Sequence, residues 1–368
     1  MIKSKTILRF LVLFNLSFFM FSCLSKEGAK SDLEKSYLPM AKGKPGEMVL
    51  VMDSVQWKPQ DGVGADLYKL VLGKSRGVLP QPEPQFTVTQ VIPSGFTSIL
   101  KQARNVLIVT TFDQNTRESA VLRSFFGKGV IEKLRKEKDK FHFIKYDAWA
   151  QGQTVELLFA KDEATLREVL NDPAKQRAIA EPFHDLETKN LQKAINKTYS
   201  RVTDKFLRKN MNVSMKLLDG YKVAQNDDNF LWLRHPEQSF DKNIFISRVP
   251  YTDQKQFDPE QIIIDRDRLA KQYLYGDPSN QNSFVVTEKL VPVESQNTKV
   301  DGRLAIETRG LWKTNNITMG GPFVSYTFTD KSGAYLYYVE GFIFAPGMDK
   351  RELVREMEAQ LKTFKEID

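Results

Sequence analysis

The chain of 368 residues contains a single cysteine, Cys23. One cysteine cannot form a disulfide within the chain, and it excludes the zinc and iron–sulfur sites that several cysteine ligands build. The three histidines, at positions 142, 184 and 235, are far apart in sequence, so a histidine-rich metal site is not indicated. With 41% hydrophobic and 27% charged residues the chain is globular, and its length fits two domains. We expect no metal and no cofactor.

The residues before Cys23 have the pattern of a secretory signal. Basic residues within the first nine positions precede an apolar run over 10–21, which is shorter than the roughly 20 residues that cross a membrane. Ser22, a small residue directly before the cysteine, completes a pattern that resembles the lipobox of bacterial lipoproteins. In those proteins the cysteine becomes the first residue after cleavage and is then acylated. The alternative is a plain signal peptide with an incidental cysteine.

We therefore expect a signal peptide over 1–22, lipid (palmitate) attachment at Cys23 and a flexible polar tether over 23–42. Two or three acyl chains, at about 0.8 kcal/mol per buried CH₂, would hold the protein almost permanently to a membrane. Leu24 is not the aspartate that retains lipoproteins in the inner membrane of enterobacteria, which favours the outer membrane of a bacterial cell envelope. The chain after the signal is only mildly basic, so nucleic acid is not an expected partner.

Hydrophobic patterns predict an α+β fold in two parts. Over 43–172 strands alternate with helices, which predicts an N-terminal α/β-type sheet domain. Its expected strands are 47–52, 85–92, 105–112, 141–146 and 154–160. Over 213–368 strand patterns dominate, with one helix over 259–275 and a terminal helix after Gly347. This strand-rich pattern predicts a C-terminal antiparallel sheet with packed helices.

A long connecting amphipathic helix is expected over 173–212. Its predicted apolar stripe repeats at helical spacing and consists of Leu191, Ile195, Tyr199, Val202 and Phe206. The opposite side is rich in lysine and arginine. Of these, Lys193, Lys197 and Arg201 are candidates for contact with anionic lipid headgroups or an acidic partner. The alternative is a solvated face with no partner.

No common catalytic motif is present. The chain lacks Gly-x-Ser-x-Gly, the phosphate-binding Gly-x-x-x-x-Gly-Lys-Ser/Thr and His-Glu-x-x-His. The pair Asp227/Asp228 lies in a turn-like Asn-Asp-Asp-Asn segment, where such residues make ordinary turn hydrogen bonds. The pair Asp265/Asp267 lies in a stretch of alternating charge typical of a solvated helix start. A catalytic role for these carboxylates is therefore not favoured.

Two segments are candidates for binding. Alternate prolines in LPQPEPQF, residues 79–86, favour an extended segment that could be a docking ledge or a stiff loop feeding a strand. Trp312, Met319 and Phe323 flank a polar, glycine-containing turn and could line a shallow partner-binding pocket. For these three residues the alternative is core and turn packing.

Several runs resemble an uncharacterised family of Bacteroidota lipoproteins, a domain of unknown function. The runs are GKPGEMVLVMDSVQW (43–57), LPQPEPQFTVTQVIP (79–93), ARNVLIV (103–109), DAWAQGQTV (147–155), GLWKTNNITMGGPFVSYTF (310–328) and VEGFIFAPGMDKRELVREMEAQL (339–361). The resemblance covers nearly the whole chain after the signal and implies a location but no activity. Residues from about 213 also resemble the PsbP-like fold, on strand order, the YYVEGFIF strand and the closing helix. That fold implies a binding or assembly module.

We interpret the chain as a membrane-anchored envelope lipoprotein that acts as a non-enzymatic binding or assembly module. Its partner would be an envelope protein or a glycan. One alternative is a hydrolase or transferase acting on cell-envelope polymers, with its site between the domains. Another is a carrier of a small apolar ligand that uses the aromatic residues of the C-terminal half. Clustered carboxylates in a deep cleft would favour the enzyme, and a dry pocket around Trp312 would favour the carrier.

Overall fold

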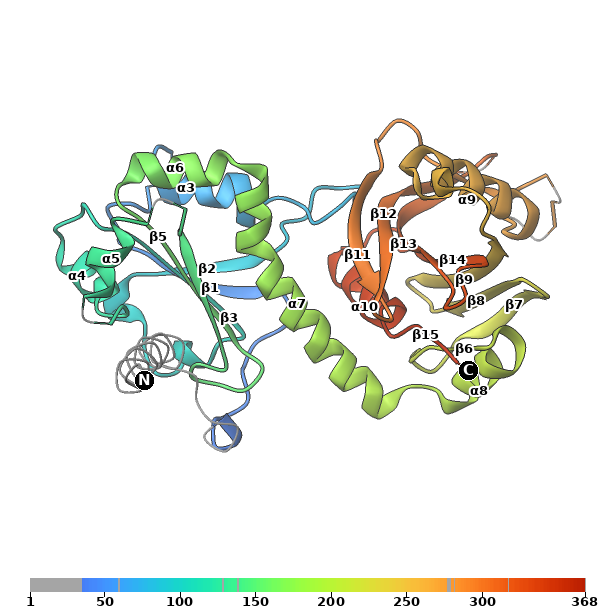
Figure 1. The fold of residues 1–368 in the computed structure, drawn as a ribbon, viewed down its shortest axis with the longest axis horizontal. Coiled ribbons are helices and arrows are strands. Elements are labelled where there is room, and N and C mark those ends of the chain that lie inside the picture. The colour runs from blue at the N-terminus through green and yellow to red at the C-terminus, as the bar shows by residue number, and fades with distance from the viewer. Residues whose placement is uncertain are drawn as a thin grey trace, which may run out of the picture.

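The computed structural model describes residues 35–367, except 59, 128, 138, 277, 278, 281 and 317. Two sheets form the cores of two domains that lie side by side, and helix α7 passes from one to the other (Figure 1). The α+β class predicted from the sequence is confirmed. Among the described helices, none is both long and apolar enough to span a membrane.

The N-terminal sheet has the strand order β2-β1-β3-β5-β4. Its strands are β1 (Glu47–Val51), β2 (Thr87–Val91), β3 (Asn105–Thr111), β4 (His142–Tyr146) and β5 (Thr154–Ala160). Only β4 is antiparallel to its neighbour. Every residue of β3 and β5 is buried, because helices cover both faces, as is usual for parallel sheets.

The helices of this domain divide between the two faces of the sheet. One face packs against α3 (Val63–Leu67), the π-helix η1 (Tyr68–Leu72), α6 (Glu163–Asn171) and the first half of α7 (Pro173–Thr198). The other face packs against α4 (Arg117–Arg123). Helix α5 (Val130–Leu134) packs against Phe112 and Phe159. Short 3-10 turns are η2 (Pro93–Gly95) and η3 (Leu100–Gln102).

The C-terminal sheet is antiparallel, with the order β10-β12-β13-β14-β9-β8-β7 and with β11 paired to β12. Its strands are β7 (Lys222–Asp227), β8 (Phe230–Pro236), β9 (Asp241–Pro250), β10 (Val285–Thr287), β11 (Glu294–Val300), β12 (Arg303–Thr314), β13 (Gly320–Thr329) and β14 (Tyr335–Phe344). Helices α8 (Arg201–Met211) and α10 (Arg351–Leu361) cover one face, and α9 (Pro259–Tyr273), preceded by η4 (Gln254–Phe257), covers the other. A small ladder joins β6 (Val213–Ser214) to β15 (Lys365–Glu366).

The helix expected over 173–212 is in fact two helices. Tyr199 is extended, and Ser200 caps α8 by accepting a hydrogen bond from the backbone N–H of Thr203. The break shifts the helical phase, so α8 buries Thr203 and its neighbours rather than Val202, which is 80% exposed. The predicted single stripe is therefore wrong at Val202, whereas Phe206 does pack against the C-terminal core. Because α8 packs into the C-terminal core, that domain begins near residue 200 rather than 213.

Candidate functional site: a polar cleft between the domains

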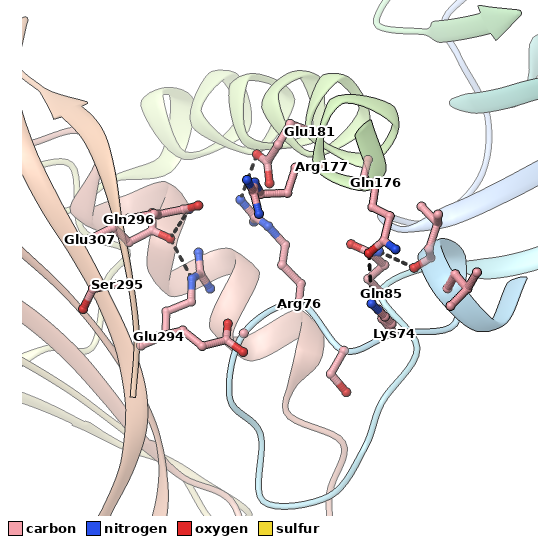
Figure 2. Close-up of a pocket in the computed structure, with 16 residues that line it drawn as sticks. Lys74, Arg76, Gln85, Gln176, Arg177, Glu181, Glu294, Ser295, Gln296 and Glu307 are labelled. Atoms are coloured by element: carbon pink, nitrogen blue, oxygen red, sulfur yellow. Dashed lines mark hydrogen bonds and ion pairs between the residues drawn. The ribbon is translucent and has the colours of Figure 1, made fainter. Parts of the chain in front are cut away.

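The two domains border a polar cleft of about 560 Å³ (Figure 2). The N-terminal domain contributes the first half of α7 and the segment from η1 to Gly77, and the C-terminal domain contributes β11 and β12. The polar side chains that line it are Lys74, Ser75, Arg76, Gln85, Gln176, Arg177, Glu181, Glu294, Ser295, Gln296, Glu307 and Arg309. Neither domain forms this cleft alone, so its shape depends on how the two are joined.

Buried charges form the floor of the cleft. In β12, Glu307 and Arg309 are both buried, and Arg309 Nε donates to Glu307 Oε1 at 2.7 Å. Glu358 of α10 lies between two arginines, with Oε2 2.8 Å from Arg76 Nη1 and 2.9 Å from Arg309 Nη2. Lys362 Nζ lies 3.0 Å from the other oxygen of Glu358. These five residues are called the charge network below.

The cations of the network keep its carboxylates ionised. Burial alone would raise the pKa of Glu358, but Arg309 and Arg76 outweigh it and hold the pKa well below its ordinary value. Burial opposes ionisation of Glu307 too, and Arg309 lowers its pKa. Glu181 on α7 differs, because burial raises its pKa and Arg76, 3.6 Å away, offsets this only in part. The floor thus carries fixed ion pairs, whereas Glu181 binds a proton more readily.

Residues 73–86, called the interdomain loop below, fasten the N-terminal domain to α10. Glu83 accepts hydrogen bonds from the backbone N–H groups of Lys350 and Arg351, both at 2.8 Å, and so caps α10 from the other domain. The Arg351 guanidinium donates back to the carbonyl of Pro84 at 2.6 Å. The proline-rich segment considered as a docking ledge therefore docks on the chain's own C-terminal domain.

Three further contacts fix the junction. Gly77 has φ +73°, and a Cβ there would lie 2.5 Å from Cδ of Arg309, so both conformation and space require glycine. Leu79 packs against the C-terminal core. Gln192 of α7 donates to the carbonyl of Ala359 in α10 at 3.2 Å. Two separate segments, the interdomain loop and α7, therefore join the domains along α10.

The edge strand β11 forms one wall of the cleft. It pairs with β12 on one side, and the described residues supply no strand on its other side. Gln296 Nε2 donates to Glu307 Oε1 at 3.0 Å and so links this wall to the charge network, while Glu294 and Ser295 are exposed. Because an edge strand presents backbone N–H and C=O groups that lack partners, the cleft offers main-chain as well as side-chain hydrogen bonds.

The structure places Trp312, Met319 and Phe323 in the core beneath α9. Trp312 is 3% exposed and its Nε1 donates to the carbonyl of Ile343 at 3.1 Å. Phe323 is 2% exposed, and the Arg266 guanidinium lies 4.3 Å from its ring centre. Met319 is partly buried against the same core. Trp312 and Phe323 are therefore too buried for a partner to reach, and Met319 is partly buried beside them.

The other candidate residues lie apart from the cleft. Lys193 and Lys197 on α7 and Arg201 on α8 are exposed, and none of them lines it. The acidic pairs make ordinary structural hydrogen bonds, such as those from Thr287 to Asp267. Cys23 lies outside the described residues. Within the described part of the chain, no group of histidine, cysteine, aspartate or glutamate side chains has the geometry of a metal site.

The sequence patterns did not identify the charge network, although a signal was present. Glu307 and Arg309 are two positions apart in a strand and must point to the same face. Glu358 interrupts the apolar stripe of α10 between Val354 and Leu361. Charged residues at core-facing positions indicate buried partners, because an unpaired buried charge is very costly. The identity of those partners requires the tertiary fold.

Comparisons with known proteins give two family matches and no activity. Residues 41–196 match the family described as "Domain of unknown function (DUF8532)", and residues 200–363 match "Domain of unknown function (DUF4837)". The gap between the two matches falls at the break between α7 and α8. No curated protein matches the chain.

Solved structures give distant similarities only. The Ran-binding protein Mog1p of Saccharomyces cerevisiae is 10% identical, covers 43% of this chain and 91% of its own, and has a TM-score of 0.27. Human StAR-related lipid transfer protein 5 is 11% identical, covers 48% of this chain and 93% of its own, and has a TM-score of 0.22. At these TM-scores the similarities assign no function. The chain thus matches the models of two uncharacterised families, one over 41–196 and one over 200–363.

Proposed function

We propose that this protein is a lipid-anchored module of the bacterial cell envelope that binds a partner in the cleft between its two domains. The observation that carries this proposal is the polar cleft of about 560 Å³, whose walls come from both domains. Its lining consists largely of charged and amide side chains. Such a lining suits a polar partner segment, either a glycan or an extended polypeptide, better than a small apolar ligand.

The internal contacts of the cleft leave its rim free to bind. The charge network pairs its cations with carboxylates on the floor, so a partner would not have to displace them. At the rim, Arg177 and Glu294 are exposed and have no ion-pair partner among the described residues. One positive and one negative group on opposite walls, with the open edge of β11 between them, would orient a partner that carries both charges or amide groups.

Membrane attachment through Cys23 is the second part of the proposal. It is supported by the basic start, the apolar run and the lone cysteine that ends it. Replacement Cys23→Ala should release the protein from membranes and abolish incorporation of a fatty-acid analogue in living cells. Wild-type protein that takes up no analogue would contradict the lipid anchor, without bearing on the cleft.

Site-specific photocrosslinking in intact cells tests binding in the cleft. A photoreactive amino acid at Glu294, on the β11 wall, should give a discrete adduct that mass spectrometry can identify. The matched control carries the same group at Glu260, an exposed glutamate at the start of α9. Adding Arg177→Ala on the opposite wall should reduce the adduct from Glu294 several-fold. Equal adducts from both positions, or none from Glu294, would contradict a binding role for the cleft.

A further inference from the structure

We propose that a basic surface on the C-terminal half of α7 and on α8 lies against anionic lipid headgroups and sets the orientation of both domains. This inference rests on the membrane attachment proposed above, because it needs a membrane close to the folded part. The basic surface consists of Lys189, Lys193, Lys197, Arg201, Lys205 and Lys209, all exposed.

Each helix carries its cations on the side away from its buried residues. In α7, Lys189, Lys193 and Lys197 recur every four residues, opposite the buried Ile195. In α8, Arg201, Lys205 and Lys209 recur at the same spacing, opposite the buried side chains that end with Met211. The two halves of the surface are therefore solvent-facing stripes that the fold does not use for packing.

The surface has almost no compensating negative charge. Residues 188–212 contain seven lysines and arginines and one acid, Asp204. Asp204 is already engaged, since Arg208 Nε donates to its Oδ2 at 2.9 Å and Lys216 lies 3.7 Å away. None of the six cations of the basic surface has an ion-pair partner among the described residues. Uncompensated cations at this density create a positive potential that attracts anionic headgroups.

The chain enters the folded part near the Lys189 end of this surface. Residues 39–41 dock on the loop before β5, where the N–H of Gln151 donates to the carbonyl of Pro39 at 2.8 Å. Asn190 of α7 donates to the carbonyl of Gly152 in the same loop, at 3.0 Å. Asn190 is next to Lys189 and one turn before Lys193. In Figure 1 the first described residues and the C-terminal half of α7 both lie along the lower side of the molecule.

The lipid anchor would then hold the basic surface close to the bilayer. The 12 residues from Cys23 to Lys35 span at most about 40 Å when fully extended. Next to the cations, Val202 on α8 is 80% exposed, and Tyr37 and Met40 near the entry of the chain are 81% and 68% exposed. Exposed apolar and aromatic side chains among cations are typical of surfaces that lie at a membrane interface. An acidic protein partner could bind the basic surface wherever the anchor lay, so the nearby anchor favours the membrane as the partner.

Vesicle binding by a chain that lacks the anchor tests the inference. The protein from Leu24 onward keeps every described residue and carries no lipid. It should sediment at low ionic strength with vesicles of one part phosphatidylglycerol to two parts phosphatidylcholine, and not with phosphatidylcholine alone. The variant Lys193→Glu, Lys197→Glu, Arg201→Glu should bind the anionic vesicles about 100-fold more weakly, because each cation contributes about fivefold. Added salt should weaken wild-type binding.

A matched control separates the basic surface from net charge. The variant Lys69→Glu, Lys255→Glu, Lys271→Glu makes the same charge change at exposed lysines on η1, η4 and α9. It should bind nearly as well as wild type, and circular dichroism should show both variants folded. Wild type that ignores anionic vesicles, or equal losses in the two variants, would overturn the inference. Because no lipid anchor is present, neither result depends on whether Cys23 is acylated.

Discussion

Two buried Glu–Arg sites show how the surroundings change the same chemistry. Beneath α9, Glu340 and Arg266 are both fully buried and form a two-pronged pair at 2.7 and 2.8 Å. At the cleft, Glu358 is just as buried but faces Arg76, Arg309 and Lys362. Burial raises the pKa of Glu340 in spite of Arg266, whereas the cations around Glu358 lower its pKa well below the ordinary value.

The difference lies in the number of cations and in where they come from. One arginine from the same domain does not fully compensate the burial of Glu340. For Glu358, the compensation includes Arg76, which the interdomain loop brings from the other domain. Ionisation of Glu358 therefore stabilises the junction between the domains, while the pair at Glu340 fixes α9 on its own sheet. The first site depends on domain docking and the second does not.

The N-terminal domain offers a third case. Glu156 on β5 is fully buried, one of its oxygens is 2.7 Å from His142 Nδ1 and the other has no hydrogen-bond partner among the described residues. Burial raises the pKa of Glu156 to about 7, and His142 offsets this only in part. With no arginine at all, this carboxylate is the least compensated of the three.

The largest effect is expected from breaking the buried Arg266–Glu340 pair beneath α9. Replacement Glu340→Leu leaves Arg266 fully buried without its carboxylate, so the C-terminal domain should lose about 3–5 kcal/mol of unfolding free energy in urea. The double variant Arg266→Met, Glu340→Leu should recover much of this loss, because it removes both charges. A single variant as stable as wild type would show that the pair is not the buried contact described here.

Glu156 should give a stability that depends on pH. Its pKa is raised in the folded state, so the folded protein binds more protons than the unfolded chain between about pH 4.5 and 7, and stability falls as pH rises through this range. Above pH 7, Glu156→Gln should be more stable than wild type by about 2–3 kcal/mol, and the two should converge near pH 4. Urea unfolding at several pH values measures this. Parallel pH profiles for the two proteins would contradict the account.

The charge network should respond to pH in the opposite sense. Because the folded pKa of Glu358 is lowered, its contribution is present above the ordinary pKa and is lost as pH falls through the folded pKa. At neutral pH Glu358→Gln should lose about 2 kcal/mol, since buried cations lose a partner. The difference from wild type should shrink in acid. A difference that grows in acid would contradict the direction of the pKa shift.

The smallest effect is expected at the cap of α10. Glu83→Ala removes two hydrogen bonds to the first backbone N–H groups of α10 and should cost about 1 kcal/mol. Hydrogen exchange should speed up in the first turn of α10 and stay unchanged in the N-terminal sheet. The matched control Glu356→Ala removes a carboxylate of the same helix that pairs with Lys242 of its own domain, and should leave that turn protected.

The sequence predicted the strands of both sheets well where apolar residues dominate. β3 and β5 each contain a run of apolar residues, which Glu156 interrupts in β5, and β14 combines aromatic and β-branched residues. It did not predict β11, whose sequence Glu-Ser-Gln-Asn-Thr-Lys-Val has one apolar residue. That strand is mostly exposed and is held by pairing with β12 rather than by burial. A polar edge strand leaves no hydrophobic period to detect, although it forms a wall of the cleft.

The candidate site could not be predicted from the sequence for a related reason. The charge network joins residues far apart in the chain, such as Arg76 and Glu358, and no local spacing brings them together. The aromatic residues around Trp312 were candidates for a pocket because large apolar side chains near glycines can line one. In the fold they fill the space beneath α9. The break at Tyr199 was also not predicted, because the residues that α8 buries depend on the domain against which α8 packs.

We expect the interdomain loop and α7 to hold the two domains as one rigid frame around the cleft. The chain from Leu24 onward has no cysteine, so spin labels can be placed by Glu168→Cys on α6 and Glu260→Cys on α9, both exposed. Double electron–electron resonance should give one narrow distance distribution. Adding Arg76→Ala and Glu83→Ala should broaden it. A broad or multiple distribution in the protein without those two changes would contradict a rigid frame and with it a preformed cleft.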